Sequence, residues 1–167
     1  LSFQEYLLAN DRIKLYEYLQ NFELSREVPL VIHQQLMTLF KEYLIIGGMP
    51  DAVSNWIENK SLLQVNQIHH DLLTTYRDDF SKYSGKTSHE VLENILFKTP
   101  QLLAKKFVYA QISQTTSSAV LKKALDLLVK AKICYPVQCV SGNGTPLAAE
   151  IKEKFFKMTL LDVGLVS

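Results

Sequence analysis

The sequence of 167 residues contains few of the residues that crosslink small folds or interrupt helices, with two cysteines, six glycines and five prolines. Cys134 and Cys139 lie five positions apart in one apolar run. In a strand this spacing turns them to opposite faces, so we expect no disulfide between them. We expect both to be buried, reduced thiols, as in a cytoplasmic protein. No apolar run reaches the roughly 18 residues that a membrane helix needs, so we expect no membrane partner. No secretory signal opens the chain, and Leu1 is not a natural start, so we expect an excised fragment.

Motifs for nucleotide binding and hydrolysis are also missing. The sequence has no Gly-x4-Gly-Lys-Ser/Thr phosphate loop, no Gly-x-Ser-x-Gly elbow and no Cys-x-x-Cys pair. On a helix the neighbouring Asp78 and Asp79 would point about 100° apart, and the neighbouring His69 and His70 lack the i, i+4 spacing of a zinc pair. We therefore expect no catalytic residue, no metal site, no ATP binding and no cofactor. A metal-dependent enzyme that uses Asp78 or Asp79 is the least favoured alternative.

The residues that are present give an ordinary globular composition. Hydrophobic residues make up 47% and charged residues 21%, and the chain is long enough for one domain or two small ones. The formal net charge of +1 gives no overall attraction to nucleic acid or membrane. Any such surface must therefore be local.

The first half of the chain is organised around residues 40–50. Pro29 begins a long helix with an apolar face formed by Ile32, Leu36, Leu39, Phe40, Tyr43 and Leu44. Gly47 can close this helix in a left-handed conformation, Gly48 permits close backbone approach, and Pro50 suits the first turn of the next helix. We interpret Gly47, Gly48, Met49 and Pro50 as a tight helix–helix corner, with a ligand-contacting loop as the alternative.

Four further helices are expected around this corner. A capping box of Ser2 and Glu5 opens a helix to residue 8, and a second helix covers residues 13–19. One helix follows Pro50, and the longest covers residues 62–80, with Gly85 ending it. The helices share no repeat, so we expect a small helical bundle over residues 1–85.

The second half of the chain changes in composition. A capping box at residues 87–90 opens a helix with Val91, Leu92, Ile95 and Leu96 on its buried face, and a short helix fits 109–114. A clear helix covers 118–130, with Val120, Leu121, Ala124, Leu125 and Leu128 inside. Strands at 133–140 and 155–160 flank a turn-rich segment. This order is typical of a winged helix-turn-helix, so we predict a mainly α protein with a winged-helix-like domain over residues 86–167.

The candidate nucleic-acid contacts are lysines on the helix at 118–130, which would be the recognition helix, and two lysines that precede it in sequence. The candidates are Lys105, Lys106, Lys122, Lys123 and Lys130. Lysines contact phosphates well but read bases poorly, and the helix has no Arg, Asn or Gln. Binding to DNA would therefore be electrostatic and insensitive to sequence. Ordinary surface lysines on a protein-interaction winged helix are the alternative.

Five motifs in order support a family resemblance over nearly the whole chain. They are Ser2-Phe3 with Glu5-Tyr6-Leu7; Glu42-Tyr43-Leu44 with Gly47-Gly48-Met49-Pro50; Tyr76 with Asp79-Phe80-Ser81-Lys82; Pro100 with Leu103-Ala104-Lys105 and Lys106-Phe107; and Phe156-Lys157-Met158 through Leu161-Asp162-Val163-Gly164-Leu165. The chain resembles the uncharacterised domain that follows the ATPase core in a group of prokaryotic AAA-superfamily ATPases. It departs at Thr115-Thr116-Ser117-Ser118, where relatives often carry Arg, and it stops at Ser167, where relatives continue into a nuclease-like module.

The resemblance implies a non-catalytic accessory domain of an ATPase. Its partner would be the ATPase core of the same polypeptide, with DNA and self-association as open alternatives. The motif residues Asp79, Lys82, Asp162 and Gly164 would be structural, like the Gly47–Pro50 corner. We expect Asp79 to pair with Lys82 or to cap a neighbouring element.

Overall fold

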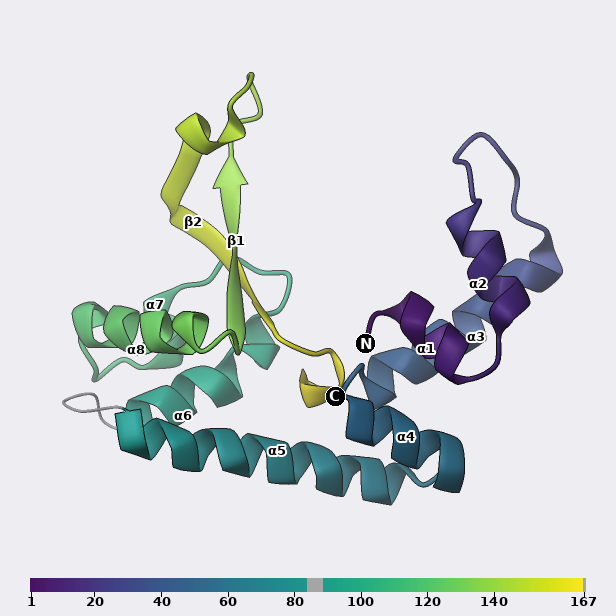
Figure 1. Ribbon diagram of the computed structural model, residues 1–167. Helices are drawn as coiled ribbons and strands as arrows, with labels where there is room; N and C mark the ends of the chain where they lie inside the picture. The colour runs from purple at the N-terminus through teal and green to yellow at the C-terminus, as the bar shows by residue number, and fades with distance from the viewer. Residues whose placement is uncertain (84–88, 167) are drawn as a thin grey trace. The chain divides into compact units, whose positions relative to one another are not determined.

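The computed structural model describes residues 1–83 and 89–166 (Figure 1). The chain divides into two compact units, the first formed by Leu1–Leu73 with Asp162–Ser167 and the second by Thr74–Leu161. The prediction of a mainly helical protein with a small antiparallel sheet is confirmed. The predicted boundary at Gly85 lies outside the described residues, and the observed division falls earlier, within helix α5 (Leu62–Tyr83).

The first unit is a set of short helices near the ranges predicted from the sequence. They are α1 (Phe3–Ala9), α2 (Ile13–Gln20), α3 (Leu30–Ile46), α4 (Pro50–Asn59), the first half of α5 and the 3-10 helix η3 (Gly164–Val166). The predicted capping box is present, because the Glu5 backbone N–H donates to Ser2 Oγ and the Ser2 N–H donates to Glu5 Oε2. Among the described residues no helix is both long and apolar enough to cross a membrane.

The core of the first unit lies beside a half-buried carboxylate, that of Glu42. The buried members of the core are Tyr6, Ile46, Ala52, Val53 and Val65. The Tyr6 hydroxyl donates to Glu42 Oε1 at 2.5 Å, and Trp56 Nε1 donates to the same oxygen at 2.8 Å. Burial, followed by the Glu42 carboxylate, raises the pKa of Tyr6. The contact therefore links α1, α3 and α4.

The predicted apolar face of α3 is only partly buried. Two residues of that face, Phe40 and Leu44, are 36% and 40% exposed. Near the C-terminal end of the helix, Tyr43 and Ile46 do pack into the core cluster. The core therefore meets this helix mainly through Tyr43 and Ile46.

The second unit contains the end of α5, three helices and a hairpin. Its further elements are α6 (His89–Lys98), η1 (Pro100–Leu102), α7 (Tyr109–Ile112), α8 (Ser118–Lys130), β1 (Cys134–Val140), η2 (Leu147–Glu150) and β2 (Ile151–Leu160). The strands are antiparallel, with Cys134 opposite Leu160 and Gln138 opposite Phe156, and the register shifts between Gln138 and Val140. The hairpin is the green and yellow pair in Figure 1. The predicted caps at Thr87 and Ser88 lie outside the described residues.

Helix α8 supplies one side of the second core. Ser117 caps it, since Ser117 Oγ accepts a hydrogen bond from the Val120 backbone N–H. The buried residues of α8 are Leu121, Ala124, Leu125 and Leu128, and those of α6 are Val91, Leu92, Ile95 and Leu96. Val120 was expected inside but is 39% exposed, because it lies in the first turn, before the buried stripe begins. Both cysteines are free thiols, as predicted, and Cys134 is buried. The expectation of burial was wrong for Cys139, which is exposed near the end of β1.

Candidate nucleic-acid interface

The Gly-Gly corner is closed by a segment more than a hundred residues away in sequence. Gly47 ends α3 at φ 77° and ψ −170°. Asp162 Oδ2 accepts a hydrogen bond from the Gly48 backbone N–H at 2.6 Å, and Asp162 Oδ1 accepts one from the Gly164 backbone N–H at 2.8 Å. We call Gly47, Gly48, Asp162 and Gly164 the Asp162 clasp. The clasp lies entirely within the first unit.

The backbone at the glycines of the Asp162 clasp is tightly packed. A Cβ on Gly47 would lie 2.0 Å from Asp162 Oδ1, and a Cβ on Gly164 would lie 2.7 Å from the Ile46 carbonyl oxygen. The buried His69 adds its Nε2, 3.0 Å from that carbonyl oxygen. Met49 packs against the core and Pro50 begins α4. These contacts favour a structural corner over a ligand-contacting loop.

Asp78 and Asp79 are the carboxylates of the metal-dependent alternative. Both are exposed on α5. Within the described part of the chain, no group of three His, Cys, Asp or Glu side chains is placed to hold a metal ion. The Lys82 side chain lies outside the described residues, so the pairing of Asp79 with Lys82 stays a prediction.

A charged cluster in the second unit was missed by sequence reasoning. The Arg77 guanidinium forms an ion pair with Glu93, and His89 Nδ1 lies 3.7 Å from Glu93 Oε1. His89 Nε2 faces the Arg77 carbonyl oxygen at 3.0 Å, which fits a donating Nε2–H. Because Arg77 comes from α5 and the other two from α6, the cluster joins these helices.

The near-zero net charge of the chain conceals two oppositely charged units. The second unit has thirteen lysine and arginine residues against seven aspartate and glutamate residues, a formal charge of +6. The first unit has five against ten, a formal charge of −5, and the two values add to the +1 of the whole chain. A local excess of positive charge attracts polyanions even when a protein is neutral overall. The second unit is therefore the part suited to an anionic partner.

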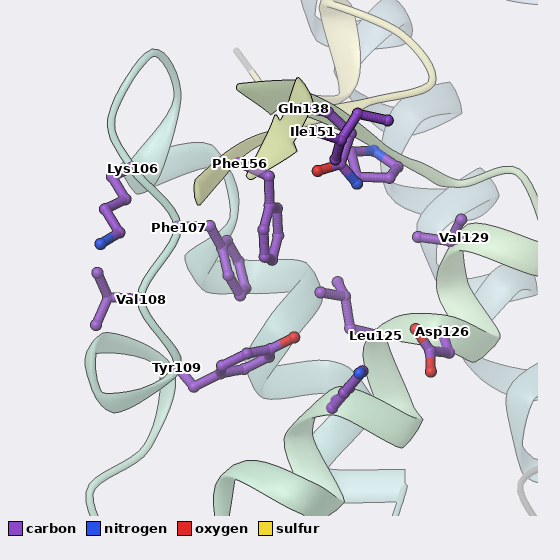
Figure 2. Close-up of a pocket in the computed structure, with 12 residues that line it drawn as sticks. Lys106, Phe107, Val108, Tyr109, Leu125, Asp126, Val129, Gln138, Ile151 and Phe156 are labelled. Carbon is purple, nitrogen blue, oxygen red and sulfur yellow. The ribbon is translucent and has the colours of Figure 1, made fainter. Parts of the chain in front are cut away.

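A groove of about 800 Å³ lies within this positive unit, between the hairpin and helices α7 and α8 (Figure 2). Its lining residues are mainly apolar and aromatic, with a few polar groups. They are Lys106, Phe107, Val108, Tyr109, Lys122, Leu125, Asp126, Val129, Pro136, Gln138, Ile151 and Phe156. Burial, followed by the Asp126 carboxylate, raises the pKa of Tyr109. This size and lining are typical of ligand sites.

The structure brings two of the five candidate lysines to the groove. Lys122 from α8 and Lys106 both line it, and Lys106 Nζ lies 3.7 Å from the centre of the Phe155 ring. Lys105 is exposed beside Lys106 in sequence, and Lys123 and Lys130 are exposed on α8. The predicted lysines are thus on the surface, where phosphates could reach them.

Sequence reasoning missed the aromatic wall of this groove. Phe107 comes directly after the Lys105-Lys106 pair and Tyr109 two positions later, and Phe156 lies on β2. A lysine pair followed by two aromatic residues was a usable signal, since proteins that bind single strands combine positive charge with stacking rings. Gln138 gave no signal, because only the strand register places it opposite Phe156.

Comparison with known proteins gives a family without a function. The family model that matches is described as Domain of unknown function (DUF8612), and it covers residues 37–167. That description names no activity and no ATPase. No curated protein and no solved structure gives a significant match to the chain.

Proposed function

This chain belongs to the DUF8612 family, and we propose that its second unit is a winged-helix module that binds nucleic acid within an AAA-superfamily ATPase. The chain itself is a non-catalytic accessory domain. The observation that carries the proposal is the formal charge of +6 on the unit that contains the recognition-helix candidate α8.

The order of elements supports the winged helix. Helices α6, α7 and α8 are followed by the hairpin of β1 and β2. Between the first two of these helices, the Phe107 backbone N–H donates to the Phe156 carbonyl oxygen at 2.9 Å, which adds a short third segment beside β2. A winged helix is expected to have this order of elements: a helix, a short extended segment, two helices and a hairpin.

The lysines support an electrostatic mode of binding. Lys122, Lys123 and Lys130 are exposed on α8, and the helix has no Arg, Asn or Gln for reading bases. Contacts of lysine with phosphate release counterions, so affinity falls steeply with salt and depends little on sequence. We therefore propose a module that holds nucleic acid without selecting a sequence.

The five motifs in order support the role within an ATPase. In this proposal the first unit couples the module to the ATPase core of the same polypeptide. Helix α3 offers a surface for that contact, because Leu30 is 69% exposed, Val31 64% and Met37 38%. Exposed apolar groups of this kind on one helix are typical of interaction surfaces.

A protein-interaction module is the second candidate function. The observation that favours it is the exposure of apolar side chains on the hairpin. Val137 is 52% exposed, Phe155 47% and Tyr135 40%. A protein partner would cover these side chains, whereas phosphates gain nothing from them.

Fluorescence anisotropy with two unrelated DNA duplexes, at low and at moderate salt, tests the proposed function. We expect weak binding of both duplexes with similar affinity, and a steep loss of affinity as salt rises. Absence of binding at low salt by a folded chain would favour the protein-interaction module. Tight binding of only one duplex would mean that another element reads the sequence.

A further inference from the structure

One wall of the groove is built for stacking a flat ring. The Phe107 and Phe156 rings are stacked, with centroids 5.4 Å apart and planes 22° apart, and Tyr109 meets Phe107 edge-on at 5.5 Å. Phe107 is only 3% exposed, so this platform is anchored in the protein before any ligand arrives. Figure 2 shows Phe156 on the cavity side of Phe107. A flat ligand entering the groove would therefore meet Phe156.

Polar groups from three elements border the same space. Gln138 comes from β1, Asp126 from α8 and Tyr109 from α7. The amide of Gln138 donates and accepts, the carboxylate of Asp126 accepts, and the hydroxyl of Tyr109 does both. A nucleobase needs this combination, because it has apolar faces and an edge that carries donors and acceptors.

We propose that this groove takes one unpaired base of a single-stranded nucleic acid, stacked on Phe156 and with neighbouring phosphates near Lys106 and Lys122. The inference rests on the proposed nucleic-acid function and names its substrate class. Both lysines line the groove, and the unit around them has a formal charge of +6. That charge favours a polyanion over an apolar peptide as the occupant.

The geometry favours a single strand over a duplex. Within a duplex a base has both faces stacked and its pairing edge occupied, so it must leave the stack before it can enter a pocket. A single strand presents such bases without that cost. Duplex binding through the exposed lysines of α8 would not involve Phe156. The two modes can therefore be separated by changing the ring and the lysines independently.

Anisotropy of a labelled 12-nucleotide thymidine oligomer, and of the same strand paired in a duplex, tests this inference. Phe156→Leu keeps an apolar side chain but removes the stacking face, so single-strand affinity should fall roughly five- to hundredfold, with duplex affinity changed less than about twofold. Gln138→Leu, at an exposed strand position, should weaken single-strand binding about two- to fivefold. Lys122→Ala with Lys123→Ala should weaken both probes.

The outcomes separate this inference from the function on which it rests. If both probes bind and neither Phe156→Leu nor Gln138→Leu affects the single strand, the base pocket is wrong and the lysine-mediated function stands. The same result is expected of a groove that takes an apolar peptide. If neither probe binds at low salt, both proposals fall. If circular dichroism shows that Phe156→Leu does not fold, the single-strand affinity of Gln138→Leu alone tests the base pocket. An unchanged affinity would then contradict it.

Discussion

The Asp162 carboxylate accepts a hydrogen bond from the Gly48 backbone N–H at 2.6 Å, across 114 positions of sequence. Its other oxygen accepts from the Gly164 N–H at 2.8 Å. The contact joins the corner after α3 to the segment that follows β2, and it completes the first unit with residues from the end of the chain. The two glycine-containing motifs that looked separate in sequence are therefore one structural feature.

Asp162→Asn should lower the free energy of unfolding of the first unit by roughly 1–3 kcal/mol. An amide has only one acceptor oxygen, so one of the two N–H donors of the clasp would lose its bond and face an NH2 group. Trp56 is the only tryptophan in the sequence and lies beside the core of the first unit, so its fluorescence reports this transition during urea unfolding. The exposed Asp11→Asn, in the same unit, is the matched control, with an expected change within about 0.5 kcal/mol. Equal effects of the two substitutions would show that the clasp contributes nothing specific.

Gly47→Ala should destabilise the protein more than Gly142→Ala. Both glycines have a positive φ, 77° and 73°, but a Cβ on Gly47 would lie 2.0 Å from Asp162 Oδ1, whereas one on Gly142 meets nothing within 4 Å. We expect about 1–2 kcal/mol for Gly142→Ala from the backbone alone, and more than about 3 kcal/mol for Gly47→Ala. Urea unfolding followed by circular dichroism measures both. If Gly47→Ala lowered the free energy of unfolding no more than Gly142→Ala, the tight packing at this corner would be contradicted.

Tyr6→Phe should lower the stability of the first unit by roughly 1.5–3 kcal/mol, the range for a hydrogen bond to a charged group. The substitution removes the donor that lies 2.5 Å from Glu42 Oε1 and leaves only Trp56 Nε1 on that oxygen. Trp56 fluorescence again follows unfolding. Tyr16→Phe on α2 serves as the control and should change stability by less than about 0.5 kcal/mol. A similar loss in both variants would mean that the Glu42 contact has no special role.

The two cysteines should differ in reactivity. Burial raises the pKa of the Cys134 thiol to about 12, so it stays protonated near neutral pH, and the thiolate is the reactive form. At pH 8, iodoacetamide should therefore modify the exposed Cys139 and leave Cys134 intact until the protein unfolds, as counted by mass spectrometry. Rapid modification of both thiols in the folded protein would contradict the buried position of Cys134.

The same shift in pKa predicts a loss of stability in alkaline solution. An unfolded thiol ionises near pH 9, whereas the folded Cys134 thiol stays neutral up to about pH 12. The stabilisation that comes from the neutral thiol is therefore complete below pH 9 and is lost as the pH rises toward 12. Cys134→Ala should therefore make the free energy of unfolding less dependent on pH in this range. The same pH dependence in both proteins would contradict a contribution from the Cys134 thiol.

Local patterns in the sequence predicted most helices because their signals lie within a few residues. Ser117 and the stripe of Leu121, Leu125 and Leu128 are enough to define α8, and its observed bounds agree with the prediction. The same reasoning could not show that Phe40 and Leu44 are more than a third exposed, because periodicity gives the apolar face of a helix but not how much of that face its neighbours cover.

Features that depend on contacts distant in sequence could not be predicted. No local signal pairs Asp162 with Gly48, since the bond exists only when the end of the chain returns to the first unit. The pairing of Gln138 with Phe156 likewise follows from strand register. The opposite charges of the two units, in contrast, could have been found from the sequence. Residues 1–85 hold seven lysines and arginines against eleven aspartates and glutamates, and residues 86–167 hold eleven against six, so the predicted boundary already separates formal charges of −4 and +5.

Comparison of two double variants that change net charge equally tests the central claim most directly. Lys122→Ala with Lys123→Ala removes two positive charges from the second unit, and Lys14→Ala with Lys41→Ala removes two from the first. Anisotropy with one DNA duplex over a range of salt should show weaker binding for the first pair, with a salt slope flatter by roughly one unit per lost phosphate contact, and unchanged binding for the second pair. Equal losses in both variants, or no binding by the unmodified chain at low salt, would contradict a nucleic-acid interface on the second unit.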